Sequence, residues 1–347
     1  MKEKNKKQGF DLASLKVVLF VVFTLALFVS YLFEKLQPEN LSPESIQNDS
    51  VGKDASSLNT ETDAKRIVIN GSKTDSDLFS FVLSSGQKIA QITNETSDEL
   101  MPVYANTSDT VAYLSDLSGK TQIWILDAQG QSSKISDSPA SLGLTPLKWS
   151  PDDRFIVFEY QREIFLLDVN SHSIERIVDN SHRASVPNWS WSGDSVFYSS
   201  QKNGEWQIWR YFLSSGKHLQ VTFEGGYSAN QHQNGDLYFS KIHQSGIWKL
   251  VPDKSSKYGF STQMKVFDDF DQTNWLSWQL QGNDLYFISA EEKEKGLIRY
   301  NLRTKTRQFI FPFDEKYLPY FSVKGDRAVF TILENRENNI EIPDRVE

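Results

Sequence analysis

Residues 148–160, KWSPDDRFIVFEY, place a tryptophan and a tight-turn signal directly before an apolar run. Proline and aspartate in SPDD favour a reverse turn, and FIVFEY has the aromatic and β-branched composition of a strand. The same order recurs in residues 188–200, NWSWSGDSVFYSS, with a tryptophan, a turn and an aromatic residue at matching places. The stretch is therefore one unit of a repeat, and the repeat determines the fold.

Weaker copies of this unit extend over most of the chain. Each copy carries an aromatic residue in its apolar run, and these residues lie 40 to 48 positions apart. This period is typical of the blades of a β-propeller. The aromatic positions are Tyr113, Phe158, Tyr198, Phe239, Phe287 and Phe330.

Further strand signals follow each copy at a similar offset. Examples are QIWILD at 122–127 and EIFLLD at 163–168, and a later strand such as RQFIF at 307–311 comes after a polar turn. Each unit thus contains four antiparallel strands, and only neighbouring sheets can cover both faces of such a sheet. We predict an all-β fold in which residues 66–347 form a β-propeller of four-stranded antiparallel blades. A β-sandwich would require these spacings to recur by chance.

The number of blades depends on the two ends of the repeat. The first unit, with KRIVIN at 65–70 and DLFSFVL at 77–83, lacks an inner strand, whereas the last, with NNIEIPD at 338–344, lacks an outer one. Seven blades fit this pattern, and so do six with a closing blade shared by the two ends. We favour seven, because seven such units can be counted.

A membrane anchor is predicted near the amino terminus. Residues 17–33 carry no charge, and the apolar segment 12–34 is long enough to span a bilayer as one transmembrane signal-anchor helix. The lysine-rich residues 1–11 predict a cytoplasmic tail by the positive-inside rule, and the polar residues 35–65 predict a flexible linker. A cleaved signal peptide is the alternative, but SYLFEK after the apolar run lacks the small residues of a cleavage site.

Composition excludes several kinds of chemistry. The 347 residues include no cysteine, so disulfides, thiolate metal sites and cysteine nucleophiles are absent. Net charge is -8, and residues 1–16 contribute five lysines against two acids, so the rest of the chain is near -11. An acidic body argues against binding of nucleic acid.

The residues that carry the repeat also resemble a known family. WSPDDRFIVF at 149–158, followed by EIFLLDV at 163–169, is similar to the repeat of TolB-type periplasmic β-propellers. The layout of tail, span, linker and propeller resembles the exported half of ToxR/CadC-like membrane-bound transcriptional regulators. Those proteins carry a winged-helix DNA-binding domain before the span, and residues 1–11 are too short for one. The resemblance implies an exported sensing or protein-binding domain.

No cofactor or metal site is predicted from the motifs. The prolyl-oligopeptidase-like enzymes that share this kind of propeller need a G-x-S-x-G nucleophile elbow, which the sequence lacks. No two of the five histidines have a metal-ligand spacing, although His182 and His232 would meet if both lie at one mouth of the channel. His172 and His218 are expected in solvated turns. The aspartates that recur at one turn of each unit are expected to serve turn geometry.

The connections that do not repeat are the predicted recognition surface. They join one blade to the next, and so we expect them to share a face at the channel mouth. Aromatic residues with an arginine suit a protein or peptide, and a concave channel suits a small ligand. The four stretches are 180–188, 223–233, 268–278 and 312–320, and the candidate residues in them are His182, Arg183, Tyr227, His232, Asp271, Trp275 and Tyr317.

These expectations together predict a single-pass protein of the inner membrane of a Gram-negative cell, with its amino terminus in the cytoplasm and its propeller in the periplasm. It would bind a periplasmic or inner-membrane protein, or a ligand, as the sensory or docking part of an envelope signalling or transcription-regulatory system. The alternative is a metal-dependent lyase or hydrolase that uses the channel mouth.

Overall fold

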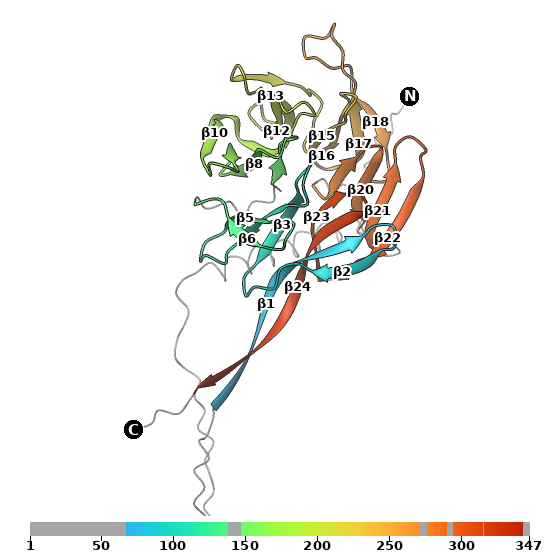
Figure 1. Ribbon diagram of the computed structural model, residues 1–347. Coiled ribbons are helices and arrows are strands. Elements are labelled where there is room, and N and C mark those ends of the chain that lie inside the picture. The colour runs from blue at the N-terminus through green and yellow to red at the C-terminus, as the bar shows by residue number, and fades with distance from the viewer. Residues whose placement is uncertain (1–66, 138–146, 271–275, 290–293, 315, 343–347) are drawn as a thin grey trace, which may run out of the picture. The chain divides into compact units, whose positions relative to one another are not determined.

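The computed structural model describes residues 67–137, 147–270, 276–289, 294–314 and 316–342, which form a β-propeller (Figure 1). The predicted tail, anchor and linker at 1–11, 12–34 and 35–65 lie outside the described residues. Within the described part of the chain, no helix has the length and apolar character needed to cross a membrane.

Five blades are built from consecutive strands, each hydrogen-bonded to the next. The first strands of neighbouring blades contact one another around most of the ring, so the first strand of each blade is the inner one. Blade 1 contains β3 (Glu99–Tyr104), β4 (Val111–Ser115), β5 (Gln122–Leu126) and β6 (Ser132–Lys134), and blade 2 contains β7 (Lys148–Trp149), β8 (Phe155–Tyr160), β9 (Glu163–Asp168) and β10 (Ile174–Val178). Blade 3 contains β11 (Ala184–Trp189), β12 (Ser195–Ser200), β13 (Gln207–Phe212) and β14 (Lys217–Gln220), preceded by the short helix η1 (Asn180–His182). Blade 4 contains β15 (Ala229–Gln231), β16 (Leu237–Lys241), β17 (Gln244–Leu250) and β18 (Met264–Phe267), and blade 5 contains β19 (Trp278–Gln281), β20 (Asp284–Ser289), β21 (Gly296–Asn301) and β22 (Arg307–Pro312).

The sixth blade, here called the closing blade, takes strands from both ends of the chain. Its order is β23 (Tyr317–Lys324), β24 (Arg327–Ile342), β1 (Ile67–Val82) and β2 (Gln87–Gln91). β1 pairs with β24 along its whole length, from Ile67 opposite Ile342 to Val82 opposite Arg327. Figure 1 shows these two strands running beyond the body as a two-stranded ribbon.

The preference for seven blades was therefore wrong, and the alternative of six with a shared closing blade is correct. KRIVIN and DLFSFVL are not separate strands, because from Ile67 the chain runs without a turn through β1. In the same way, NNIEIPD does not start a new strand, since residues 338–342 continue β24. The two incomplete units are halves of one sheet.

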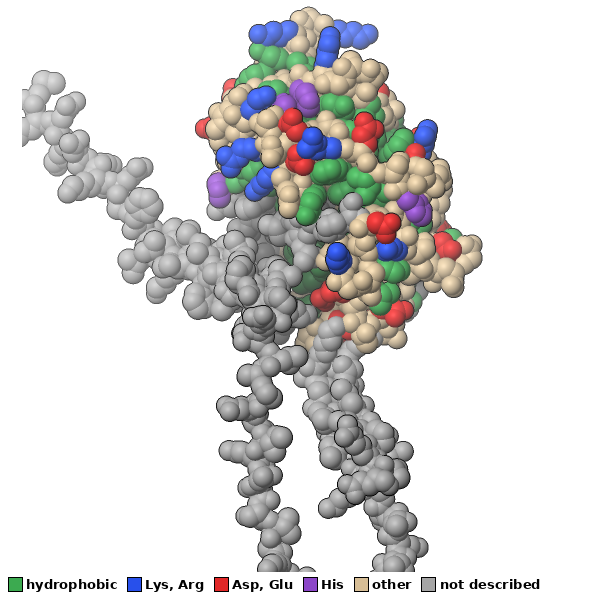
Figure 2. All heavy atoms as spheres, turned by 90° about the vertical axis from the view of Figure 1, so that its left-hand side faces the viewer, with side chains coloured by type: hydrophobic (Ala, Val, Ile, Leu, Met, Phe, Trp, Pro, Cys, Tyr) green, Lys and Arg blue, Asp and Glu red, His purple; other side chains and the backbone are tan. Residues whose placement is uncertain are grey.

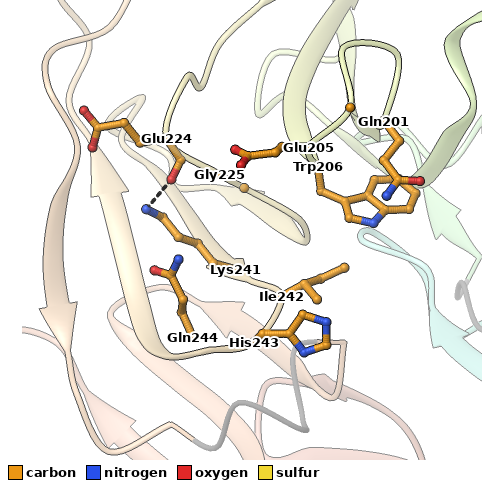
Figure 3. A pocket seen from close by; sticks show the side chains of 11 residues that line it. Gln201, Glu205, Trp206, Glu224, Gly225, Lys241, Ile242, His243 and Gln244 are labelled. Carbon is orange, nitrogen blue, oxygen red and sulfur yellow. Dashed lines mark hydrogen bonds between the residues drawn. The ribbon is translucent and has the colours of Figure 1, made fainter. Parts of the chain in front are cut away.

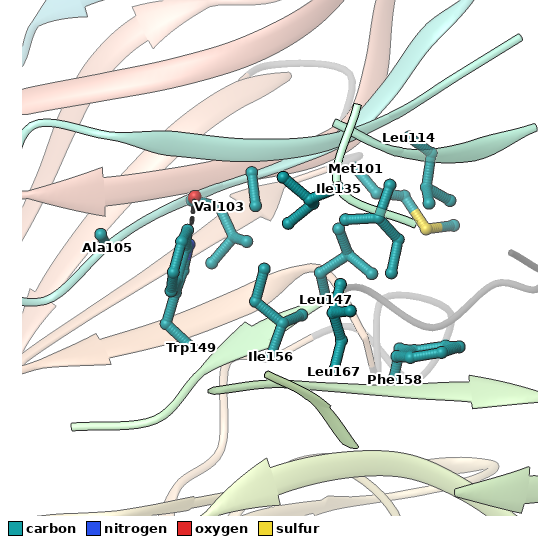
Figure 4. Close-up of a cluster of buried hydrophobic side chains, with 12 residues drawn as sticks. Met101, Val103, Ala105, Leu114, Ile135, Leu147, Trp149, Ile156, Phe158 and Leu167 are labelled. Carbon is teal, nitrogen blue, oxygen red and sulfur yellow. Dashed lines mark hydrogen bonds between the residues drawn. The ribbon is translucent and has the colours of Figure 1, made fainter. Parts of the chain in front are cut away.

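The apolar cores lie between blades. One cluster joins Val103 and Leu114 of blade 1 to Trp149 and Phe158 of blade 2 (Figure 4). Successive residues of a strand point to opposite faces, so each blade contributes to a cluster on either side. Similar clusters lie between the other neighbouring blades. All six repeated aromatic residues are at most 4% exposed, which confirms their architectural role.

Hydrogen bonds also cross between blades near the channel. The indole Nε1 of Trp149 donates to the carbonyl of Val103 at 3.1 Å, and that of Trp189 donates to the carbonyl of Lys148 at the same distance. At the turn between the first and second strands of blade 2, the Asp153 carboxylate accepts from the backbone of Asn106 and Thr107 in blade 1. The recurring aspartate at this turn thus serves geometry, as expected.

A group of buried carboxyl groups lies where the closing blade meets blade 1. Asp77 and Glu99 are 0% and 1% exposed. Glu99 accepts hydrogen bonds from Ser97 at 2.5 Å and Ser115 at 3.1 Å. Burial, with the charge of Asp77 adding to it, raises the pKa of Glu99 to about 8 despite these two hydrogen bonds.

We predict that Trp149→Phe lowers the free energy of unfolding by about 1–3 kcal/mol, because the Val103 carbonyl loses its buried donor and a cavity is left. Trp191→Phe is the matched control, since the Trp191 side chain is 59% exposed. Urea denaturation of both variants measures the difference. Equal stabilities would show that the inter-blade hydrogen bond contributes nothing.

We also predict that stability falls as the pH rises from about 4.5 to about 8, because the folded state keeps a proton on Glu99 that the unfolded chain releases. Glu99→Gln removes this proton uptake, so it should flatten the pH dependence and stabilise the fold at the upper end by on the order of a few kcal/mol. Denaturation across this pH range measures the effect, with Glu95→Gln on the exposed neighbouring loop as the control. A slope unchanged by Glu99→Gln would contradict the assignment.

Candidate functional site

The two ends of the ring differ in what they present. At one end, here called the connector end, the outer strand of each blade connects to the inner strand of the next. The turn between the second and third strands of each blade lies at the same end, because successive strands are antiparallel. The predicted recognition stretches all begin in these connectors but run on into the inner strands.

The structure therefore separates the predicted site residues. His182 and Arg183 lie in the connector before β11, and Tyr227 lies in the connector before β15. His232 follows β15, in the turn to β16, where its backbone N–H donates to the Asp236 carbonyl at 2.8 Å. It thus lies at the opposite end of the inner strand, because β15 is only three residues long. The condition for a site formed by both His182 and His232, that they lie at one mouth of the channel, is therefore not met. Asp271 and Trp275 lie outside the described residues.

His182 packs against blade 3. Its ring stacks on His218 with 4.3 Å between centroids, and its Nε2 lies 3.3 Å from the ammonium of Lys202. His218 bonds to the Tyr198 hydroxyl at 2.8 Å, so the expectation of a solvated turn was wrong for this residue. Burial, helped by the neighbouring His182 and Lys202, lowers the pKa of His218 to about 4. In the described part of the chain, no three His, Cys, Asp or Glu side chains are placed to hold a metal ion.

Tyr227 and Tyr317 support other aromatic residues. Tyr227 is 7% exposed, and its ring packs edge-on against Trp206 at 5.0 Å between centroids. Tyr317 begins β23 and stacks on Phe313 at 4.4 Å. Arg183 is exposed beside the connector. Trp206, against which Tyr227 packs, lines a cavity.

This cavity, here called the blade 3–4 pocket, has a volume of about 380 Å³. Three segments of the connector end surround it: the β12–β13 turn of blade 3, the connector to blade 4, and the β16–β17 turn of blade 4 (Figure 3). They contribute Gln201, Gly204, Glu205 and Trp206; Glu224, Gly225 and Gly226; and Lys241, Ile242, His243 and Gln244.

Two glycines shape the connector above the pocket. Gly225 has φ +88°, a conformation that side chains disfavour. A Cβ on Gly226 would lie 2.8 Å from Thr222 Oγ1 and 2.9 Å from Ile208 Cγ1, so only glycine fits. The Gln207 carboxamide oxygen accepts from the Gly225 N–H at 3.1 Å and thereby fixes the connector on blade 3. The EGG sequence at 224–226 therefore holds this wall in place.

Lys241 lines one side of the pocket. The residue is 6% exposed, its ammonium donates to the Glu224 carbonyl at 2.6 Å, and it lies 4.8 Å from the ring centre of Trp248. Burial lowers the pKa of Lys241, and the charge of Glu224 opposes this shift. On the other side, Trp206 is half-buried, with the Arg162 guanidinium 5.5 Å from its ring centre.

Trp206 and Lys241 were not among the predicted site residues, although the repeat contains a signal for Lys241. Two positions after each repeated aromatic residue, the six units carry Ser115, Tyr160, Ser200, Lys241, Ser289 and Ile332. Lys241 is the one charged residue in this series. The pocket thus contains a charged residue, Lys241, at a position where the other units carry an uncharged one.

Charge is mixed on the face shown in Figure 2, where basic and acidic side chains alternate with hydrophobic ones. The connectors themselves are acidic, and so they do not provide the positive field that a phosphate backbone requires. Their described charged residues are Glu95, Asp98, Asp137, Asp179, Glu224, Asp268, Asp269 and Asp314 against Arg183 and Lys316.

Residues 86–257 match the family model described as the TolB beta propeller domain. TolB from Acinetobacter baumannii is a similar solved structure, with a TM-score of 0.53 and 16% identity over 67% of this chain and 62% of that one. The present chain thus spans less than two thirds of that structure's length. A chain of the nidogen/laminin complex has a TM-score of 0.52 and 9% identity, over 69% of this chain and 94% of that one.

Oligogalacturonate lyase from Vibrio parahaemolyticus has a TM-score of 0.49 and 11% identity, over 75% of this chain and 77% of that one. No curated protein matches the chain. Identities this low show the fold alone, a β-propeller, and this fold agrees with the match of residues 86–257 to the TolB beta propeller domain.

Proposed function

We propose that this chain is a binding protein that captures a protein or peptide at the connector end of its propeller. The observation that carries the proposal is the blade 3–4 pocket, in which a half-buried tryptophan and a buried lysine line one cavity of about 380 Å³. Pockets that combine an apolar wall with a few placed polar groups are typical ligand sites. The rigid blades on either side hold both walls in place.

The enzymatic alternative is not favoured. It relied on a two-histidine centre at the channel mouth, and His182 and His232 lie at opposite ends of the inner strands. The sequence lacks a G-x-S-x-G elbow. The likeness to a lyase is below a TM-score of 0.5 and so transfers no activity.

We further propose that residues 12–34 anchor the chain in the inner membrane of a Gram-negative cell. Residues 1–11 would stay in the cytoplasm, and the propeller would stand in the periplasm on a linker of residues 35–65. The charge pattern of the sequence supports this topology. The partner would be another periplasmic or inner-membrane protein in an envelope signalling or transcription-regulatory system. The composition of the linker predicts a flexible chain, which would not transmit a rigid rotation of the propeller. The signal would therefore pass by recruitment of the partner.

We predict that a photo-crosslinking amino acid at Gln244, on the pocket rim, captures a partner in intact cells. The same substitution at Gln129, an exposed glutamine in the turn between β5 and β6 at the other end of a blade, should not. Trp206→Ala should reduce the Gln244 adduct about tenfold, as expected for loss of an aromatic anchor. Adducts from both positions in equal yield, or from neither, would contradict binding at the connector end.

For the anchor, we predict that the full chain stays with membranes after alkaline extraction and that Val21→Arg with Leu25→Arg releases it. Each arginine near the middle of the span costs about 2.5–3.5 kcal/mol. Intact mass analysis of the extracted chain separates the alternatives. A mass that lacks the residues up to the end of the apolar run would show a cleaved signal peptide instead.

A further inference from the structure

The Lys241 ammonium is a buried charge on which the charge of Glu224 acts without a direct ion pair. Its bonds are the one to the Glu224 carbonyl and the contact with the Trp248 ring, and no carboxylate of the described residues forms an ion pair with it. Some basic side chains on the blades are paired, for example Lys249 with Asp236 at 3.1 Å and Arg299 with Asp284 at 2.6 Å. A buried charge is costly unless it is paired and hydrogen-bonded. Lys241 can therefore offer its charge to an anionic group of a ligand in the pocket.

The pocket also carries a charge of the opposite sign. Glu205 and Lys241 come from different blades, and Figure 3 shows both side chains pointing toward the segment formed by Glu224 and Gly225. The Glu224 carboxylate is directed elsewhere, because it accepts from Gln263 at 2.6 Å. Glu205 is therefore the acid that a ligand beside Lys241 would meet.

The surroundings select among anions. Glu205 and Glu224 line the pocket together with Lys241, so a simple multivalent anion such as phosphate would meet two acidic residues as well as the ammonium. A ligand that carries both a carboxylate and a nitrogen donor has little net charge and satisfies both walls. The volume of about 380 Å³ is at the low end of ligand pockets, which suits one or two amino-acid residues.

We propose that the blade 3–4 pocket binds an α-carboxylate with its adjacent nitrogen, in the form of a free amino acid or the carboxyl-terminal residue of a peptide. The carboxylate binds the Lys241 ammonium, the nitrogen donates to Glu205, and the ligand side chain packs on Trp206. This inference rests on the proposed function and specifies the ligand at the same site.

Equilibrium dialysis of the purified full-length chain tests the proposal. The probes are a mixture of the free amino acids, a pool of random tetrapeptides with free carboxyl termini, and the same pool with carboxyl-terminal amides. Mass spectrometry measures what is retained. Retention of a carboxylate form at least about tenfold above the amide pool is expected, since a charge-assisted hydrogen bond contributes about 1.5–3 kcal/mol. Retained amino acids or retained peptides distinguish the two sources.

Variants assign the binding to Lys241. Lys241→Met should abolish the preference for carboxylates, whereas Lys265→Met, which removes another ammonium 5.4 Å from the centre of the same Trp248 ring, should leave it unchanged. Glu205→Gln should weaken retention of amino acids more than that of peptides, because a free amine carries the full charge. If Lys241→Met does not fold, the acetylation rate of Lys241 decides: the free-carboxylate pool should slow it and the amide pool should not.

Equal retention of the two peptide pools with no retained amino acids, retention of none of the probes, or full carboxylate binding by a folded Lys241→Met variant would overturn the proposal. These results are separate from the test of the proposed function. Crosslinking from Gln244 with no carboxylate preference would leave a binding protein that recognises its partner differently. Loss of that crosslink would remove the proposed function itself.

Discussion

The pairing of β1 with β24 is the constraint on which the rest of the structure depends. Each apolar core lies between two blades, so a blade with one neighbour would expose a face of aromatic and aliphatic side chains. Only a closed ring buries all six cores, and closure requires the two ends of the chain to share one sheet. The β1–β24 register extends over sixteen residues of each strand, which places the closure in backbone hydrogen bonds and in the clusters on either side.

The repeat predicted the fold class but not the number of blades, for one physical reason. A turn that precedes an apolar strand is a local signal, and Trp149 with Asp153 illustrates it well: both residues serve the contact with blade 1, and every unit needs such a contact. The closing blade has no continuous sequence, because residues 67–91 and 317–342 form it together. Counting units along the chain therefore counts this blade twice. The pairing of β1 with β24 joins strands that are far apart in the sequence, and the period of the repeat does not reveal it.

The candidate site was predicted less well than the fold. The connectors were expected at one end, and the stretch 223–233 does line the pocket through Glu224 to Gly226. Residues inside the stretches were misplaced because the length of an inner strand cannot be read from composition. With three residues in β15, His232 passes to the other end of the ring. His182 and Tyr227 make ring contacts with His218 and Trp206, and their role in recognition stays a prediction.

Departures from the repeat are more informative than residue type in a fold of this kind. Three other blades carry serine at the position of Lys241, and two carry Tyr160 and Ile332, so the architecture does not require a lysine there. The adjacent connector departs in the same place, because its Gly225 lies against the Lys241 stem and its Gly226 leaves no room for a side chain. Lys241 and the adjacent connector both depart from the repeat, and together they form a cavity with a charge within it. The other blades form the same architecture without these two features, so the architecture does not explain them. Local violations of the rules that specify a fold are expected where function requires them, and this expectation supports the proposal that the blade 3–4 pocket binds a ligand.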